Sequence, residues 1–501
     1  MTGQAKGRRM VGRTILAIAV IAAVGCGPAQ EPRLDAAQMT TRPNVLFLFA
    51  DDQRADTIAA WGNPNIRTPN LDRLAAAGFS FRNNYNLGSN SGAVCVPSRA
   101  MVNTGRAYFR VPNDLRGATL LPELLGENDY VTFATGKWHN GEESWLQGFQ
   151  RGQALFFGGM SDHSQVPLVD LVGPGELGNE RVGQKLSSEL FADAAIDFLE
   201  NYRGERPFYA YVAFTAPHDP RMPPQELRDY YDENPPPLPD NFLPLHPFNF
   251  GGGALTTRDE QLAAWPRAEE VIRDQIAEYY GLITHLDGQI GRILDALQAG
   301  DHADDTIVVY AADHGLALGS HGLLGKQNIY EHSQRCPLIF AGPGVPHGES
   351  EAFTYLLDIF PTVTALTGTP TPAGLDGADL SGIWRGETTG VRDSVFLAYT
   401  RLARSVRNER YKLIRYPQVD ETQLFDLLSD PTEIENLAAD PEYAGLIDEL
   451  TALLVEWQAR LGDTEPLVVD NPQPREIDLG SLQREPDRWQ PPWIVEKYFQ
   501  R

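Results

Sequence analysis

Acidic and imidazole side chains directly follow two apolar runs of this sequence. Asp51 and Asp52 come after NVLFLFA, and Asp313 and His314 come after TIVVYAA. Three carboxylates crowded together in a protein interior need a cation to be tolerated, and oxygen ligands suit calcium. The imidazole of His314 would also suit a transition metal. These residues therefore indicate a metal site.

Two further apolar runs end in residues that can move protons or bind anions. YVTFAT at 130–135 is followed by Lys137 and His139, and PFYAYVAF at 207–214 is followed by His218. Runs of this length and composition predict buried strands. In open α/β sheets ligands bind beyond the carboxyl ends of the strands, so we expect all four clusters to form one site.

Cys95 lies in the segment GAVCVPSRAMVNTGR, where Pro97 or Ser98 is expected to begin a helix. A helix N-terminus favours negative charge and bound anions, so the Cys95 side chain would face an anion-binding region. At average residue usage the order Cys, any residue, Pro, Ser, Arg arises by chance in roughly one chain of this length in a thousand. A purely structural cysteine is therefore the weaker interpretation.

Helical patterns lie between these strands, at 68–81 (TPNLDRLAAAGFSF) and at 268–300. Strands that alternate with helices predict a largely parallel sheet covered on both faces. Toward the C-terminus SVFLAY, RSVRNERYKLIRY and QLFDLLSD predict short antiparallel strands. We therefore predict an α/β fold with a large mixed, mostly parallel sheet flanked by helices in residues 42–385. A smaller C-terminal α+β domain with an antiparallel sheet, and a tail, would follow in 386–501. The Pro- and Gly-rich segment 235–253 would form a surface loop near the mouth of the site.

The N-terminus predicts export. A basic segment and the run ILAIAVIAAVGCG resemble a signal peptide over residues 1–26, and AAVGC is similar to the lipobox in which Cys26 would carry lipid. A simple cleaved signal is the alternative, because Ala23 stands where a lipobox usually has Leu. Residues 27–41 are polar and would form a tether. We expect a periplasmic protein or a membrane-anchored lipoprotein, with the cell surface as one location.

Charge and cysteine usage exclude other roles. The formal net charge of -25 argues against binding of nucleic acid, and an anionic substrate would have to be met by local cations. The chain has three cysteines. If Cys26 carries lipid and Cys95 is modified, no disulfide framework remains. Cys336, in the apolar context QRCPLIF, is expected to be a buried packing residue.

Together these motifs make the chain resemble the type I sulfatase family. The defining motif of that family, C-x-P-S-R followed by T-G-R, is present from Cys95 to Arg106. The resemblance runs over about residues 42–440 and ends in QLFDLLSDPTEIENLA. It implies a fold similar to alkaline phosphatase and a formylglycine made from Cys95 by a formylglycine-generating or sulfatase-maturating enzyme. The DHG and GKxxxYE motifs resemble the iduronate-sulfatase-like branch.

The resemblance also implies roles for particular residues. One calcium ion per chain would be held by the family's metal-ligand positions together with the formylglycine, namely Asp51, Asp52, Cys95, Asp313 and His314. Arg99 would hold the formylglycine, Lys137 would contact the sulfate, and His139 would assist its elimination. His218 and Lys326, the latter in LGKQNIYE, would flank the sulfate and the leaving oxygen.

The function implied is hydrolysis of a sulfuric ester on a sulfated poly- or oligosaccharide. One alternative keeps the formylglycine and acts on phosphonate monoesters or phosphodiesters. A second alternative is a noncatalytic protein that binds sulfated glycans. Candidate residues for the specificity pocket are Asn86, Ser89, Asn90, Ser91, His163, Arg221 and His321.

Overall fold

The computed structural model describes residues 1–2, 42–488 and 490–499. Apart from residues 1–2, the expected signal peptide with Cys26 and the expected tether lie outside the described residues. Among the helices that the structure describes, none is long and apolar enough to cross a lipid bilayer.

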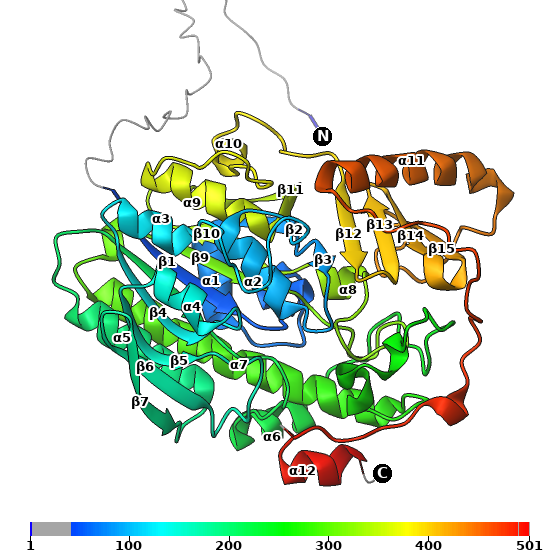
Figure 1. The fold of residues 1–501 in the computed structure, drawn as a ribbon, viewed down its shortest axis with the longest axis horizontal. Coiled ribbons are helices and arrows are strands. Elements are labelled where there is room, and N and C mark those ends of the chain that lie inside the picture. Colours follow the sequence, from blue (N-terminus) through cyan, green and yellow to red (C-terminus); the bar gives the residue numbers. More distant parts are fainter. Residues whose placement is uncertain (3–41, 489, 500–501) are drawn as a thin grey trace, which may run out of the picture. The chain divides into compact units, whose positions relative to one another are not determined.

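A ten-stranded sheet runs through the centre of the protein (Figure 1). In spatial order its strands are β11 (Gly348–Tyr355), β2 (Phe79–Tyr85), β10 (Leu338–Ala341), β9 (Thr306–Ala312), β1 (Asn44–Ala50), β8 (Phe208–Ala213), β4 (Val131–Lys137), β5 (Arg151–Phe156), β6 (Pro167–Gly173) and β7 (Glu176–Val182). β10 and the β6–β7 hairpin run antiparallel to their neighbours, and the remaining pairs are parallel. This arrangement confirms the predicted mixed, mostly parallel sheet.

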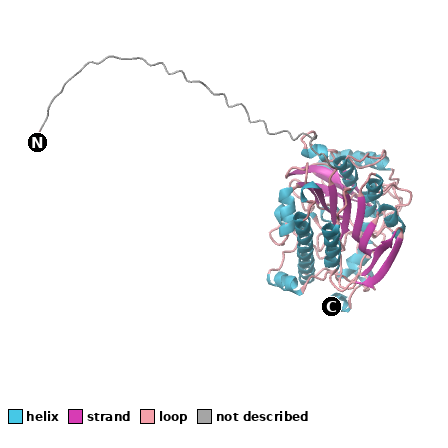
Figure 2. Cartoon of the chain, turned by 90° about the vertical axis from the view of Figure 1, so that its left-hand side faces the viewer, coloured by secondary structure: helices cyan, strands magenta, loops and turns pink. Residues whose placement is uncertain are grey.

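Helices cover both faces of this sheet (Figure 2). One layer packs around the long helix α7 and contains α1 (Pro69–Ala77), α5 (Ser187–Asn201) and α7 (Glu269–Ala299). The other layer contains α2 (Cys95–Thr104), α3 (Leu121–Glu127), α4 (Glu142–Gly148) and α9 (Ile359–Thr367). The central strands β1, β8, β4 and β9 are buried along their whole length, which explains why they are apolar without alternation.

The helical pattern expected over 68–81 is too long. α1 ends at Ala77, and Phe79 begins β2 instead. The reason is the close approach of the chain at Gly78 to strand β10: a Cβ atom built on Gly78 would lie 2.3 Å from the carbonyl oxygen of Phe340. The segment must therefore leave the helix to pair with the sheet.

A second, five-stranded sheet lies beside the first, in the order β15 (Glu421–Asp426), β14 (Tyr411–Tyr416), β13 (Ala403–Arg407), β12 (Val395–Tyr399) and β3 (Gly88–Ser89). The four later strands are antiparallel, as predicted, and α11 (Ala444–Leu461) packs on them. β3 is parallel to β12 and belongs to the segment that leads to Cys95. Gly88 permits this pairing, because its φ is +111° and a Cβ atom there would lie 1.9 Å from the oxygen of Ala398. The domain boundary expected at residue 385 stays a prediction. β3 lies before this boundary in the chain but belongs to the small sheet.

The remaining helices are short: α6 (Gln225–Glu233), α8 (Glu331–Gln334), α10 (Ser381–Trp384) and α12 (Pro492–Ile494). Segment 235–253 contains no helix and no strand, as expected for a loop. It is anchored to the small sheet, because Phe248 and Phe250 are buried in the same apolar cluster as Tyr416 and Leu402. Cys336 is fully buried in the core of the large sheet, as predicted.

Candidate active site

The four predicted clusters meet at one edge of the large sheet. β9, β1, β8 and β4 are consecutive parallel strands, so their carboxyl ends point to the same side. The residues that follow these strands therefore lie together. Lys137 is the last residue of β4, and Asp51 and Asp313 directly follow β1 and β9.

Two carboxylates form the floor of the site. Asp51 makes a short ion pair with Lys137 and lies 3.5 Å from Nη2 of Arg99, and Oδ2 of Asp313 lies 3.6 Å from the same Arg99 nitrogen. The backbone N–H of Asp52 donates to Oδ1 of Asp313 at 3.0 Å. Oδ1 of Asp51 and Oδ2 of Asp313 are buried with no hydrogen-bond partner among the described residues. Burial and the neighbouring Asp51 charge raise the pKa of Asp313 to about 7.

These unsatisfied atoms fit a divalent cation. Ligand atoms of Asp51, Cys95, Asp313 and His314 all lie within 4.8 Å of one another, and Nε2 of His314 also has no hydrogen-bond partner among the described residues. A second, overlapping group within the same distance adds Asp52 and His218 to Asp51 and Cys95. The two groups together contain three carboxylates, whose oxygens suit calcium or magnesium, beside one sulfur and two imidazole ligands. Buried carboxylates of this kind are stabilised by the charge of a bound cation.

Cys95 stands at the first position of α2, so the helix begins earlier than the expected Pro97 or Ser98. Its side chain is buried, and Nζ of Lys326 lies 3.6 Å from its sulfur. Burial raises the pKa of the Cys95 thiol, but Lys137 and Lys326 outweigh it and hold the pKa well below its ordinary value. This position therefore stabilises a negatively charged group at the end of the Cys95 side chain.

Arg99 and Ser98 tie α2 to the strand ends. Arg99 donates from Nη1 to the backbone oxygen of Lys137 at 2.9 Å, and the Ser98 hydroxyl donates to the backbone oxygen of Asp313 at 2.7 Å. Asn140 was not among the predicted site residues. Its side-chain amide donates to the backbone oxygen of Val96 at 3.0 Å and so holds the first turn of α2. The position directly after GKWH was the signal that could have identified it.

The electrostatic surroundings of His218 and His139 shift their pKa values in opposite directions. Burial lowers the pKa of His218, but Asp52, with Oδ2 3.9 Å from Nε2, outweighs it and raises the pKa well above its ordinary value. Burial lowers the pKa of His139, whose Nδ1 has no hydrogen-bond partner among the described residues. The site thus favours protonation of His218 and disfavours protonation of His139. Lys326 completes it by donating to both oxygens of Asp52 at 2.8 and 3.0 Å.

The structure brings together all the predicted catalytic and metal-binding residues, whose individual roles stay predictions. They are Asp51, Asp52, Cys95, Arg99, Lys137, His139, His218, Asp313, His314 and Lys326.

Several residues expected to line a specificity pocket are instead buried and bonded within the protein. His163 bonds to the Ser187 hydroxyl at 2.8 Å and to the backbone oxygen of His218 at 2.9 Å. His321 bonds to the backbone oxygen of Glu433 at 2.8 Å. Arg221 donates to Gln275, and Asn86 and Ser89 are buried. Polarity alone did not distinguish these internal roles from sugar binding. Asn90 and Ser91 retain exposure.

The fold and site define an α/β protein with a candidate cation-binding cluster beside an anion-stabilising side chain. The sulfatase family profile matches residues 43–369, and the profile of the C-terminal region of N-sulphoglucosamine sulphohydrolase matches residues 319–460. The chain therefore belongs to the sulfatase family, within the alkaline-phosphatase-like superfamily, and it is a sulfatase.

Characterised relatives agree with this assignment. The chain is 28% identical to an N-acetylglucosamine-6-O-sulfatase from Bacteroides thetaiotaomicron over 90% of this chain and 91% of the relative. It is 27% identical to an ulvan-active sulfatase from Formosa agariphila over 84% of this chain and 82% of the relative. A solved structure in complex with its substrate D-glucosamine-2-N,6-O-disulfate has 25% identity and a TM-score of 0.73, covering 85% of this chain and 99% of that chain.

Proposed function

We propose that this sulfatase removes sulfate from a sulfated carbohydrate through a formylglycine made from Cys95 and with a calcium ion. The observation that carries the proposal is the position of Cys95, which lies beside Lys326 and between the buried carboxylates and two histidines, His218 with a raised pKa and His139 with a lowered pKa. Two relatives are named as an N-acetylglucosamine-6-O-sulfatase and an ulvan-active sulfatase, and these names support a sugar substrate.

Asp51, Asp52, Asp313 and His314 would hold the calcium ion. When bound, the ion would supply positive charge to the sulfate oxygens and help to deprotonate the nucleophile. Lys137 and Lys326 add two further cations next to the Cys95 side chain, which offset the charge that gathers on the nonbridging oxygens. Arg99 fixes the geometry, because it binds both the floor carboxylates and the backbone of Lys137.

The two histidines divide the proton transfers. As a hydroxyl of the hydrated formylglycine attacks sulfur, Asp313 would accept the proton of that hydroxyl. As the sulfur–oxygen ester bond breaks, His218 would donate its proton to the departing alcohol. The neutral His139 then accepts a proton from the second hydroxyl, so that sulfate leaves and the aldehyde returns. Water adds to the aldehyde to complete the cycle. This division follows from the raised pKa of His218 and the lowered pKa of His139.

Mass spectrometry of the peptide that contains Cys95 tests the proposal. The protein is expressed with and without a formylglycine-generating enzyme, and sulfate release from an aryl sulfate and from sulfated oligosaccharides is measured in parallel. We expect the thiol to be replaced by an aldehyde and activity to follow the modified fraction, with Cys95→Ala inactive. Activity in protein with an unmodified Cys95 would contradict the mechanism. A preference for an aryl phosphonate over the aryl sulfate would favour the phosphonate hydrolase alternative, and glycan binding without any sulfate release would favour the noncatalytic one.

We also propose that the protein is exported and carries lipid on Cys26, which would place it near extracellular sulfated glycans. The support is the basic and apolar N-terminal sequence that ends in AAVGC. Incorporation of labelled palmitate into the full-length protein, and its loss in Cys26→Ala, tests the anchor. Fully secreted, unlabelled protein would instead indicate a simple cleaved signal.

A further inference from the structure

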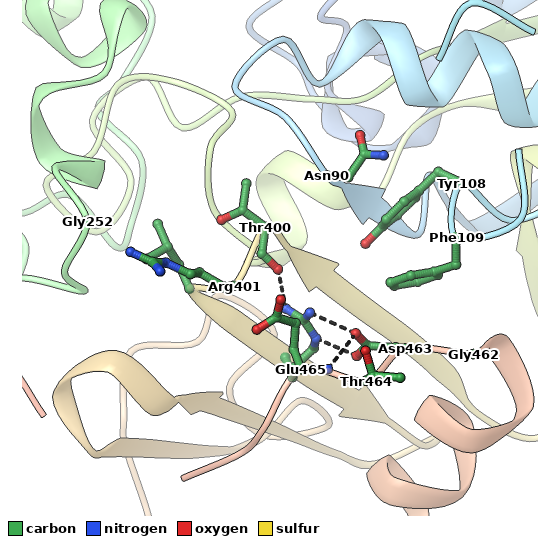
Figure 3. Close-up of a pocket in the computed structure, with 12 residues that line it drawn as sticks. Asn90, Tyr108, Phe109, Gly252, Thr400, Arg401, Gly462, Asp463, Thr464 and Glu465 are labelled. Atoms are coloured by element: carbon green, nitrogen blue, oxygen red, sulfur yellow. Dashed lines mark hydrogen bonds and ion pairs between the residues drawn. The ribbon is translucent and has the colours of Figure 1, made fainter. Parts of the chain in front are cut away.

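A cleft of about 610 Å³ lies between the segment that leads to Cys95, the turn between β12 and β13, and the segment that follows α11 (Figure 3). Asn90 and Phe109 line it on one side, and Thr400, Arg401 and Glu465 line it on the other. None of these residues takes part in the chemistry proposed above. The cleft therefore needs a separate explanation.

Hydrogen bonds link a residue of the cleft to the active site. The side-chain amide of Asn113 donates to Oδ1 of Asn90 at 3.2 Å, and the amide of Asn140 donates to the backbone oxygen of Asn113 at 2.7 Å. Asn140 directly follows His139. Asn90 is also only five residues before Cys95, so their Cα atoms lie within about 18 Å of each other. An oligosaccharide of a few units can bridge such a distance.

Arg401 brings an unpaired positive charge to this cleft. Its side chain is exposed, and within residues 42–488 and 490–499 nothing forms a hydrogen bond or ion pair with its guanidinium. The protein as a whole is strongly negative, so an anionic ligand has to be met by local cations of this kind. Arginine suits the task because its planar fork of donors matches sulfate and carboxylate oxygens.

The turn that presents Arg401 is held rigidly. The backbone N–H of Thr400 donates to the oxygen of Ser89 at 2.7 Å, and Nη1 of Arg404 donates to the oxygen of Thr400 at 2.5 Å. Arg404 is buried and also binds both oxygens of Asp463, at 2.6 and 2.9 Å, so the charge of Asp463 is neutralised. The backbone of this turn therefore loses little conformational entropy when a ligand binds.

The other walls suit a sugar ring. Phe109 is half-buried and stacks on Tyr108, with ring centroids 4.2 Å apart, which offers an apolar surface to the C–H face of a sugar. The exposed carboxylate of Glu465 and the amide of Asn90 can bond to hydroxyl groups. A cation, an aromatic face and hydroxyl-binding groups together describe a site for a sugar with one anionic substituent.

We propose that this cleft binds a second, anionic sugar unit of the substrate, with Arg401 on its sulfate or carboxylate group and Phe109 against its ring. The inference rests on the proposed function of the Cys95 site, since it treats the two sites as parts of one binding surface for an oligosaccharide. It assigns to Arg401 a role in substrate choice.

Binding to the inert variant Cys95→Ala tests the cleft separately from catalysis. Calorimetric titrations use tetrasaccharides from heparin, chondroitin sulfate and κ-carrageenan. We expect at least one to bind, and Arg401→Ala to weaken it about tenfold or more, as for loss of one charge-assisted contact. Arg67→Ala is the matched control, because Arg67 is exposed and stacks on Tyr230 outside the cleft. Desulfated and carboxyl-reduced forms of the bound tetrasaccharide show whether Arg401 binds a sulfate or a carboxylate group.

Kinetics of the mature enzyme provide the second readout. We expect Arg401→Ala to raise KM for the bound tetrasaccharide with little change in kcat, and to leave hydrolysis of a small aryl sulfate unchanged. Equal affinities for Arg401→Ala and Arg67→Ala, or no binding of any of the three tetrasaccharides, would overturn the proposal. Weakened binding in Arg401→Ala together with no sulfate release by the parent enzyme would support the cleft and contradict the proposed function instead.

Discussion

Arg99 is the side chain that joins the carboxylates of the site to its nucleophile helix. Its buried guanidinium lies 3.5 Å from Asp51 and 3.6 Å from Asp313 and donates to the backbone of Lys137. Lysine is a compact point charge and lacks the planar fork of donors with which Arg99 spans these partners. We expect Arg99→Lys to lower kcat for sulfate release by about 100-fold, the upper range for groups that orient ligands of a catalytic site. Arg116→Lys, at an exposed arginine, is the control, and equal rates for the two variants would refute this role.

Removal of the cation should destabilise the protein as well as inactivate it. Without the ion, Asp51 and Asp313 keep buried oxygens that lack partners among the described residues. An ion present at a hundred times its Kd stabilises the folded state by about 2.7 kcal/mol. We therefore expect chelation to lower the melting temperature and calcium to restore it, with a smaller calcium effect in Asp313→Asn. Melting curves that are identical with chelator and with calcium would contradict the assignment of the metal ligands.

Residues whose role depends on a strand end could be predicted from sequence, and residues whose role depends on a tertiary contact could not. Asp51, Lys137 and Asp313 directly end or follow apolar runs, so local sequence places them at the sheet edge. Asn140 acts by binding the backbone of Val96, a partner 44 positions away. His163 is a second example. It was expected at the substrate pocket because its polarity does not reveal its partners inside the protein.

At the scale of elements, the long helix α7 and the buried apolar strands were predicted well, and the very short strand β3 was not. The helix expected at 268–300 is α7, and the four buried strands begin and end within two residues of their predicted positions. β3 has two residues, which is too short for any period to appear in the sequence. It exists because Gly88 lets the chain lie against β12, and this contact places Asn90 at the cleft.

The C-terminal segment supports His218 from outside the large sheet. Asp219 lies 3.2 Å from Nδ1 of His218 and forms ion pairs with Arg258, which also binds Asp487, and the Gln490 amide donates to Asp219 at 3.0 Å. Removing Arg258 leaves the Asp219 charge poorly compensated, so His218 should lose its fixed orientation.

We expect Arg258→Ala to lower kcat about tenfold with a smaller change in KM, and Arg258→Lys to recover part of the loss. Steady-state kinetics on one substrate measure both values. Arg228→Ala is the control, because Arg228 forms comparable ion pairs with Asp274 and Asp232 on helices away from the site. A loss of kcat as large in Arg228→Ala would indicate a general loss of stability and not a role in positioning His218.

At the scale of the whole molecule, the sequence predicted two sheets and which of them comes first along the chain. It did not predict how the small sheet is attached to the large one. The attachment uses buried polar groups that lie far apart in the chain. Lys412 of β14 forms ion pairs with Glu331 at 3.0 Å and Glu433 at 2.7 Å, and His321 and His332 lie beside them. Residues of these types usually occupy surfaces, so a sequence alone does not place them in an interior.

This attachment should make the protein sensitive to acid. Burial, together with the nearby Lys412, lowers the pKa of His321 to about 4, although the hydrogen bond to the backbone of Glu433 and the charge of Asp430 act in the opposite direction. In the unfolded chain the same imidazole has a pKa near 6.5 and binds a proton first as the pH falls. Between about pH 6.5 and 4 the unfolded state therefore binds more protons than the folded state. The free energy of unfolding decreases as the pH falls through that window.

We expect His321 to contribute up to about 1.4 kcal/mol per pH unit to this decrease, the value for one proton. Urea unfolding with calcium present, at pH values from 7 to 4.5, measures the slope for the parent protein and for His321→Gln. Glutamine can still donate to the backbone oxygen of Glu433, and it cannot become charged, so the variant should show a shallower slope. His302→Gln, at a histidine in the turn before β9, should keep the parental slope, and a parental slope in both variants would mean that His321 is not a source of the acid sensitivity.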